Sequence, residues 1–216
     1  MLRILLADDH DLTRAGLRYL LEKQKDWSVC AEASNGRKAL ELAEALHPDI
    51  AILDMSMPEM NGLDVTRHIS KSQPDTKVLI YTMLETESII LDALEAGAQG
   101  IVLKSDAGEN MVTAVESIAR GRRFFTSRVA ETVVEAYLSK KSGAQPAHHS
   151  QVILTARERA VVQLLAEGKS NKEVADRLGI SARTAEGHRA EIMRKLRLES
   201  LAQLVRYAIR NSIVQP

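Results

Sequence analysis

The sequence is poor in cysteine and in long apolar runs, and each shortage excludes a class of protein. Its single cysteine, Cys30, rules out a disulfide framework and a metal cage built from thiolates. No uninterrupted apolar run approaches the roughly 18 residues that a membrane-spanning helix needs. The first residues, Met1-Leu2-Arg3, lead into a short strand pattern and an acidic cluster, which is not a secretory signal. We therefore expect a cytoplasmic protein with no membrane partner.

Net charge is also absent, because 29 basic and 29 acidic residues cancel, but the two signs are unevenly distributed. Residues 1–121 carry a net charge of −8, residues 122–150 of +3, and residues 151–216 of +5. The length of 216 residues suits two small domains, and the 45% apolar content is enough for packed cores. We predict domains over 1–121 and 151–216 with different partners, joined by a linker over 122–150 that holds a helix at 127–138.

Five short apolar segments alternate with helical patterns in the first domain. The sequence predicts strands at 3–7, 28–33, 50–54, 77–82 and 100–103, and helices at 12–23, 36–46, 63–71, 87–95 and 110–120. This alternation is typical of an α/β fold with a doubly wound, five-stranded parallel sheet. The second strand is less apolar than the others, which favours a position near the edge of the sheet.

Polar side chains lie at the carboxyl ends of four of these strands: Asp8 and Asp9, Asp54, Thr82, and Lys104. Ligands of such sheets bind at the carboxyl ends of the strands, so these side chains are expected to converge. Clustered carboxylates need a cation, and oxygen ligands fit Mg²⁺ better than Zn²⁺. A carboxylate beside Mg²⁺ can attack phosphorus, while an ammonium and a hydroxyl stabilise the phosphoryl oxygens.

A simpler interpretation is that acids at strand ends are solvated or cap the next helix. Asp9 or Asp11 could cap the helix that follows the first strand. This interpretation is reasonable for any one residue, but it does not account for five such residues at matching strand ends.

The motifs around these residues resemble a known family. They are LLADDH, ILDMSMPEMNG, YT and LK, and their order and spacing are those of the receiver domain of bacterial two-component response regulators. The resemblance covers residues 1–121. It implies that Asp54 accepts a phosphoryl group from a sensor histidine kinase.

The same resemblance implies a role for each neighbour of Asp54. Mg²⁺ would be bound by Asp9 directly, by Asp8 through water, by Asp54, and by the backbone carbonyl of Ser56. Lys104 would contact the phosphoryl group, and Thr82 would move to meet it.

One position departs from the family pattern. Receivers commonly carry Tyr or Phe three residues before the lysine, where this chain has Ile101. Tyr81 is adjacent to Thr82, but strand alternation directs it to the opposite face, so we do not expect it to replace that aromatic residue. Ile101 supports an alternative hypothesis, in which the chain binds DNA without regard to phosphorylation.

A further alternative is an enzyme, a Mg²⁺-dependent phosphohydrolase with Asp54 as nucleophile. Such enzymes usually place a general acid two residues after the nucleophile, and here that position is Ser56. They also need a substrate cap, for which the chain has no obvious segment. We therefore expect a regulator whose only catalysis is its own phosphorylation and dephosphorylation.

From Leu154 onward the pattern is helical. Thr155 and Glu158 form a capping box, Ser170 or Asn171 begins a short helix, and Ser181 begins a third. Two helices joined by LGIS fit a helix-turn-helix, which places its second helix in the major groove of DNA. The domain has one aromatic residue, Tyr207, so stacking on single-stranded bases is not expected.

The segment LTARERAVVQLLAEGKSNKEVADRLGISARTAEGHRAEIMRKL resembles the LuxR-type helix-turn-helix, and the whole chain resembles response regulators of the NarL/FixJ class. The resemblance implies binding of double-stranded DNA through Asn171, Lys172, Ser181, Arg183, Thr184, Glu186, Gly187, His188, Arg189, Ala190, Arg194 and Lys195. Among these, Glu186, Gly187, Arg189 and Ala190 would face the base edges. The last helix carries one apolar stripe, Leu201, Leu204, Val205 and Ala208, which must pack on the other helices. The resemblance implies that the same helix also forms a homodimer contact.

These expectations combine into a transcription regulator controlled by phosphorylation. In the resting protein the receiver is expected to mask the recognition helix or to block its dimerisation. Phosphorylation would shift this equilibrium toward the form that binds DNA.

Overall fold

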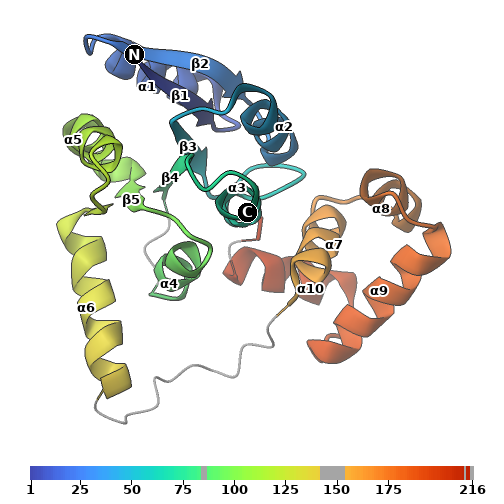
Figure 1. The fold of residues 1–216 in the computed structure, drawn as a ribbon. Helices are drawn as coiled ribbons and strands as arrows, with labels where there is room; N and C mark the ends of the chain where they lie inside the picture. Colours follow the sequence, from blue (N-terminus) through green and yellow to red (C-terminus); the bar gives the residue numbers. More distant parts are fainter. Residues whose placement is uncertain (84–86, 142–153, 212, 215–216) are drawn as a thin grey trace. The chain divides into compact units, whose positions relative to one another are not determined.

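A computed structural model describes residues 1–83, 87–141, 154–211 and 213–214, which form two compact units. The first unit contains a parallel sheet with helices α1 to α6, and the second contains helices α7 to α10 (Figure 1). Among the described residues, no helix combines the length and the apolar character needed to cross a membrane.

The sheet of the first unit has the strand order β2-β1-β3-β4-β5-β6, and every pairing is parallel. Its strands are β1 (Leu2–Ala7), β2 (Trp27–Ala33), β3 (Ile50–Asp54), β4 (Lys77–Thr82), β5 (Gly100–Leu103) and β6 (Phe124–Phe125). This confirms the predicted doubly wound α/β fold and the edge position of the second strand. The predicted number of five strands is wrong, because β6 pairs with β5; its two residues are too few to form a periodic pattern.

The helices of the first unit lie on both faces of the sheet (Figure 1). They are α1 (Asp11–Glu22), α2 (Gly36–Leu46), α3 (Gly62–Ser72), α4 (Glu87–Glu95), α5 (Ala107–Ala119) and α6 (Ser127–Lys141). Residues of α1 and α5 share one apolar cluster with β1, β3, β4 and β5, so these two helices cover the same face. Helices α2 and α3 contact the strands from the other face.

Side-chain caps explain where two of these helices begin. Asn35 accepts a hydrogen bond from the Lys38 amide at the start of α2, and Asn61 accepts one from the Asp64 amide at the start of α3. The alternative that Asp9 or Asp11 caps α1 is wrong. The cap position is His10, whose side chain makes no capping hydrogen bond.

Helix α6 lies where a helix was predicted, but it extends past residue 138 to Lys141. It contacts α4 and β6 and belongs to the first compact unit, which therefore reaches beyond residue 121. The part of the predicted linker that follows α6, residues 142–150, lies outside the described residues.

The second unit is a small helical bundle of α7 (Ala156–Ala166), α8 (Asn171–Leu178), α9 (Ala182–Lys195) and α10 (Leu201–Arg210). Its first three helices begin as predicted. Thr155 with Glu158 and Ser170 with Glu173 form capping boxes, and Ser181 caps α9. Gly179 ends α8 in the left-handed conformation, at a φ of 64°, which turns the chain toward α9.

Candidate functional site

Three carboxylates meet at the carboxyl end of the sheet. Asp8 and Asp9 follow β1, and Asp54 ends the adjacent strand β3. One ligand atom from each of these residues and from His10 lies within 4.8 Å of the others. Asp8 and Asp54 are each only 1% exposed, so the cluster is drawn into the protein rather than solvated at its surface.

Lys104 supplies the positive charge of this cluster. It follows β5, and its Nζ lies 2.7 Å from Asp8 Oδ2 and 3.0 Å from Asp54 Oδ2. Burial tends to lower the pKa of Lys104, but the charges and hydrogen bonds of Asp54 and Asp8 outweigh it and raise the pKa. The ammonium therefore stays charged beside the two carboxylates.

The pKa of Asp54 is raised above the ordinary carboxyl value. Burial is the largest cause, and the negative charge of Asp8 adds to it, while Lys104 and a hydrogen bond from the Ser56 backbone act in the opposite direction. The single positive charge of Lys104 thus does not fully offset the negative charges of the two buried carboxylates. A bound cation would add positive charge and stabilise them.

Thr82 completes the set of predicted side chains at this rim. It ends β4, is 1% exposed, and pairs in register with Leu103, the residue before Lys104. Ser56 is also buried and lies in the turn that follows Asp54. The structure therefore places the side chains of Asp8, Asp9, Asp54, Thr82 and Lys104 at one edge of the sheet.

The donor set fits a hard cation such as Mg²⁺. Asp9 Oδ1 and Asp54 Oδ2 are buried, yet neither accepts a hydrogen bond in good geometry from the described residues. Each has a nitrogen neighbour: His10 Nδ1 lies 2.9 Å from Asp9 Oδ1, and Lys104 Nζ lies 3.0 Å from Asp54 Oδ2. Buried carboxylate oxygens without hydrogen-bond donors are suitable metal ligands.

Two neighbours of the cluster, His10 and Arg14, were not predicted from the sequence. His10 Nδ1 lies 2.9 Å from Asp9 Oδ1 and 3.2 Å from Asp8 Oδ1, and its side chain is 56% exposed. Arg14 is mostly buried and donates from Nη1 to the Asp8 carbonyl, at 2.7 Å, which ties α1 to the loop of the acid pair. Adjacency to Asp8-Asp9 could have indicated His10, but no pattern indicates the contact of Arg14.

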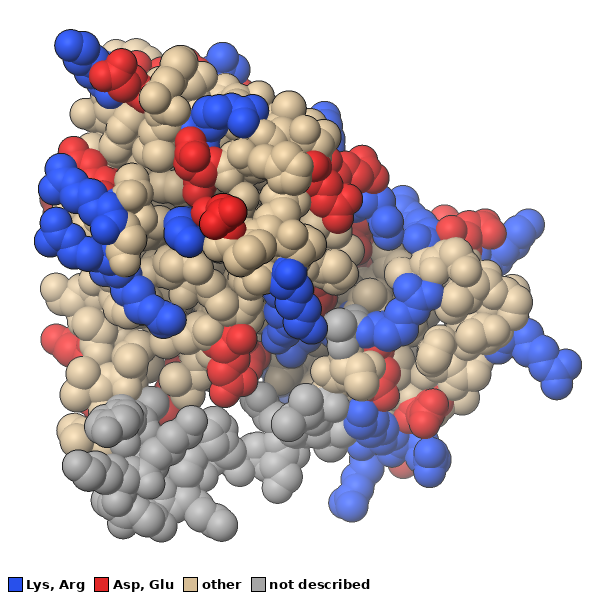
Figure 2. Space-filling model, in the orientation of Figure 1, with Lys and Arg blue, Asp and Glu red and all other residues tan. Residues whose placement is uncertain are grey.

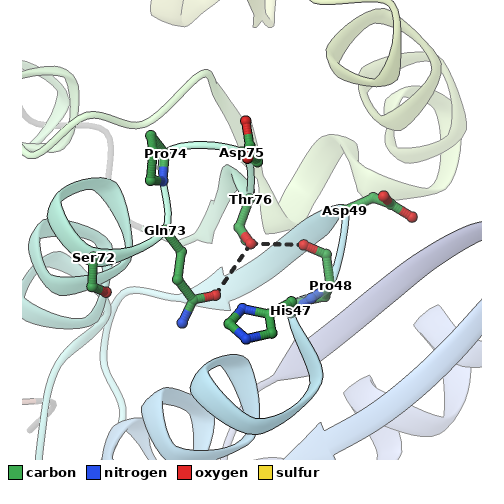
Figure 3. Close-up of a pocket in the computed structure, with 8 residues that line it drawn as sticks. All are labelled: His47, Pro48, Asp49, Ser72, Gln73, Pro74, Asp75 and Thr76. Atoms are coloured by element: carbon green, nitrogen blue, oxygen red, sulfur yellow. Dashed lines mark hydrogen bonds between the residues drawn. The ribbon is translucent and has the colours of Figure 1, made fainter.

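A pocket lies at the amino ends of β3 and β4, and it contains none of the predicted site residues (Figure 3). It is lined by His47, Pro48, Asp49, Ser72, Gln73, Pro74, Asp75 and Thr76. The Thr76 hydroxyl donates to the Pro48 carbonyl at 2.7 Å, and Asp49 accepts from the Arg3 amide at 2.7 Å. These hydrogen bonds connect neighbouring loops and strands. The polar groups that line the pocket therefore stabilise the fold, which accounts for their presence without a ligand.

In the second unit, α8 and α9 form the predicted helix-turn-helix. Most of the predicted DNA-contacting residues are exposed: Lys172, Ser181, Arg183, Thr184, Glu186, Gly187, Ala190 and Arg194. Asn171, His188, Arg189 and Lys195 are partly buried. Figure 2 shows Lys and Arg side chains projecting from the part of the second unit that holds α8 and α9. Ala185 and Ile192 point inward, so the exposed face of α9 is distinct from its core face.

Lys195 differs from the other basic residues of α9. Its Nζ lies 2.7 and 3.0 Å from the carboxylate oxygens of Glu158 in the capping box of α7. Burial tends to raise the pKa of Glu158, but Lys195 and Thr155 outweigh it and lower the pKa. Lys195 therefore has a structural partner within its own unit.

The structure corrects part of the predicted dimer contact. Leu204 and Ala208 are 0% exposed and belong to the apolar core of the second unit, so they offer no surface to a partner. The stripe of α10 was expected both to pack on the other helices and to contact a partner, and these two residues serve only the packing. Leu201 is 41% exposed and Val205 is partly exposed, so these two remain candidates.

Comparison with known proteins assigns both units to families. Residues 4–116 match the response regulator receiver domain, and residues 152–208 match the bacterial regulatory proteins of the luxR family. The chain is 35% identical to the oxygen regulatory protein NreC of Staphylococcus epidermidis, over 99% of this chain and 100% of NreC. It is 34% identical to the uncharacterized transcriptional regulatory protein YxjL of Bacillus subtilis, over 99% of this chain and 98% of YxjL.

Solved structures agree with this assignment. The RcsB response regulator of Salmonella typhimurium is similar at 25% identity and a TM-score of 0.59, over 95% of this chain and 97% of RcsB. The response regulator ChrA of a heme-sensing two-component system is 32% identical with a TM-score of 0.52, over 99% of this chain and 98% of ChrA. The chain therefore belongs to the bacterial two-component response regulators that join a receiver domain to a LuxR-type helix-turn-helix, and it is a transcription regulator controlled by phosphorylation.

Proposed function

We propose that Asp54 is the phosphoacceptor and that Asp8, Asp9, Asp54 and the Ser56 carbonyl hold Mg²⁺. The observation that carries this proposal is the convergence of three carboxylates and one ammonium at a single edge of the sheet. The phosphomimetic BeF₃⁻ was present in a structure of the isolated receiver domain of RcsB, which is 25% identical over 61% of this chain.

The chemistry follows from the position of each group. An oxygen of the Asp54 carboxylate attacks the phosphorus of a phosphohistidine, forming an oxygen–phosphorus bond as the nitrogen–phosphorus bond breaks and the histidine leaves. When bound, Mg²⁺ supplies positive charge to the phosphoryl oxygens. The Lys104 ammonium contacts the phosphoryl group, and Thr82 donates a hydrogen bond to it. The histidine kinase is thus the phosphodonor, and the receiver catalyses only its own modification.

Incubation with labelled acetyl phosphate and Mg²⁺ tests the acceptor. Wild-type protein is expected to take up label and Asp54→Asn is not. Asp64→Asn is the matched control, because Asp64 is a buried carboxylate of the same unit that pairs with Arg67 outside the cluster. Label that persists in Asp54→Asn would exclude Asp54 as the acceptor.

We infer that the output is binding of double-stranded DNA through α9. The structure of RcsB with 25% identity is described in terms of DNA interaction. The capped N-terminus of α9, with Ser181 and Thr184, offers hydroxyl and amide donors to phosphate, and Glu186 and Arg189 carry side chains able to read cytosine and guanine. Two copies bound to paired half-sites would dimerise through exposed residues of α10 such as Leu201.

The affinity for operator DNA, measured with and without beryllofluoride, tests whether phosphorylation controls the output. We expect tighter binding and a shift from monomer to dimer when beryllofluoride and Mg²⁺ are present. Equal affinities would favour the alternative of binding independent of phosphorylation, which Ile101 supports because it is 1% exposed and not aromatic. The cytoplasmic location expected from the sequence stays a prediction.

A further inference from the structure

Tyr81 lies beside Lys104 at the phosphorylation site. The Nζ atom of Lys104 is 5.1 Å from the centroid of the Tyr81 ring, within the range of a cation–π interaction. Tyr81 is 6% exposed and the Lys104 side chain is 11% exposed, so the contact is largely shielded from water. A cation–π contact is stronger when water is largely excluded from the ammonium and the ring.

The strand register explains how Tyr81 reaches this site, although its side chain lies on the opposite face of the sheet from Thr82. Tyr81 pairs with Val102 across β4 and β5, and paired residues of parallel strands point to the same face. Lys104 follows Val102 by two residues and begins the 3₁₀ turn after β5, and its ammonium lies beside the Tyr81 ring. Both Tyr81 and Val102 belong to the apolar cluster shared with α1 and α5.

The usual aromatic position lies on the opposite face. Ile101 pairs in register with Ile80, which alternates with Tyr81 along β4. Tyr81 therefore does not replace the missing aromatic residue at position 101. It contacts the site from the face of α1 and α5, through Lys104 rather than through Thr82.

The ring differs in kind from the carboxylates that also contact Lys104. Among the described residues, the Lys104 ammonium also contacts Asp8 and Asp54, the carboxylates proposed for metal binding and phosphoryl transfer. A π face does not compete for the phosphoryl oxygens or for a metal ion. Burial raises the pKa of Tyr81, as do Asp8 and Asp54, against the effect of Lys104, so the ring stays a neutral phenol.

We propose that Tyr81 is a positioning residue that holds the Lys104 ammonium in place for the phosphoryl group on Asp54. The proposal rests on the proposed role of Lys104 as the phosphoryl contact. Adjacent residues of β4 would then serve the same group by different routes, Thr82 by a hydrogen bond and Tyr81 through the lysine.

The test compares Tyr81→Phe, which keeps the π face, with Tyr81→Leu, which keeps only apolar bulk. We expect Tyr81→Leu to weaken binding of beryllofluoride in saturating Mg²⁺ by about 3- to 30-fold, the range of a partly desolvated cation–π contact, and Tyr81→Phe to change it less than about 2-fold. Leu79→Val controls for lost packing, because Leu79 belongs to the same cluster on the same strand. A loss in Tyr81→Phe equal to that in Tyr81→Leu would overturn the proposal.

Two further measurements separate positioning from simple destabilisation. In NMR spectra, the ε-methylene protons of Lys104 should carry a ring-current shift in wild type and Tyr81→Phe that disappears in Tyr81→Leu. In a Lys104→Ala background, Tyr81→Leu should have no further effect on beryllofluoride affinity. The same loss in both backgrounds would refute action through Lys104. A Lys104→Ala variant with full affinity would instead refute the assigned role of Lys104, while labelling of Asp54 tests the acceptor separately.

Discussion

The backbone of Gly62 lies directly against the carbonyl group of Asp54. A Cβ atom at position 62 would overlap the Asp54 carbonyl oxygen and would approach Met55 Cα to 3.1 Å. The Gly62 amide donates to the Met55 carbonyl at 2.9 Å, so the two segments are held together by hydrogen bonding as well. The absence of a side chain at residue 62 is thus a condition for the position of the acceptor.

Gly62→Ala is therefore expected to lower stability and to slow phosphorylation. Since the overlap is with backbone atoms, β3 or α3 must shift, and overpacking of this kind costs about 1–3 kcal/mol of unfolding free energy. Urea unfolding and acetyl phosphate labelling measure the two effects. Gly108→Ala is the control, because a Cβ at residue 108 meets nothing within 4 Å. Normal labelling in Gly62→Ala would contradict the coupling between Gly62 and the acceptor.

The raised pKa of Asp54 predicts how pH and metal change stability. A carboxyl group whose pKa is higher in the folded state binds its proton more tightly there, so its ionised form destabilises the fold at neutral pH. Asp54→Asn should therefore have a higher Tm than wild type at pH 7 without metal. This gain should shrink as the pH falls through the raised pKa and vanish below the ordinary carboxyl value of about 4.

Saturating Mg²⁺ should reduce or reverse that difference, because the cation stabilises only the folded wild-type site. Thermal unfolding with EDTA and with Mg²⁺ provides the measurement, and Asp75→Asn, a change at an exposed carboxylate, is the control. A lower Tm for Asp54→Asn at pH 7 in EDTA would show that Lys104 more than compensates the buried charge.

Two capping residues of the second unit separate stability from DNA contact. The Ser181 hydroxyl accepts from the Thr184 amide at 3.0 Å, and the Thr155 hydroxyl accepts from the Glu158 amide at 3.2 Å. Replacing either residue by Ala should cost about 1 kcal/mol of unfolding free energy. Only Ser181→Ala should also weaken DNA binding, measured at a temperature where both variants are folded. Equal losses of DNA affinity would mean that Ser181 acts only through the cap.

The basic residues of the second unit should differ in their contribution to the salt dependence of DNA binding. Lys172→Ala and Arg194→Ala remove exposed charges, and each should reduce the slope of log affinity against log salt by about 0.9. Lys195→Ala should change this slope less and should lower the Tm, since Lys195 pairs with Glu158. Binding titrations at four salt concentrations measure the slopes; a full unit of change for Lys195→Ala would assign it to phosphate.

The sheet and the carboxylate cluster were predictable because both depend on local patterns. Apolar runs and capping residues set the elements, and the parallel order brings the strand ends together, so Asp8, Asp54 and Lys104 could be named from the sequence. The contacts of His10, Arg14 and Tyr81 were not found, because they depend on side-chain directions across neighbouring elements. Alternation placed Tyr81 on the correct face, but it did not show that the Lys104 ammonium lies beside the ring.

The errors have a common physical origin. Two residues, Phe124 and Phe125, form a strand only because the edge of β5 is available for pairing. Leu204 and Ala208 lie on an apolar stripe, and a stripe alone does not distinguish a core contact from a partner contact. In both cases the tertiary surroundings, and not the local sequence, decide the outcome.

The contact between α4 and α6 connects the phosphorylation site of the receiver to the end of its last helix. Helix α4 follows β4, the strand that ends at Thr82, and α6 leads along the chain toward the second unit. Because the two helices pack together, we expect a rotation of α4 to displace α6. At about 1.5 Å per residue, the 15 residues of α6 span roughly 22 Å. Over that length, a small rotation at one end of the helix displaces its other end by several ångströms.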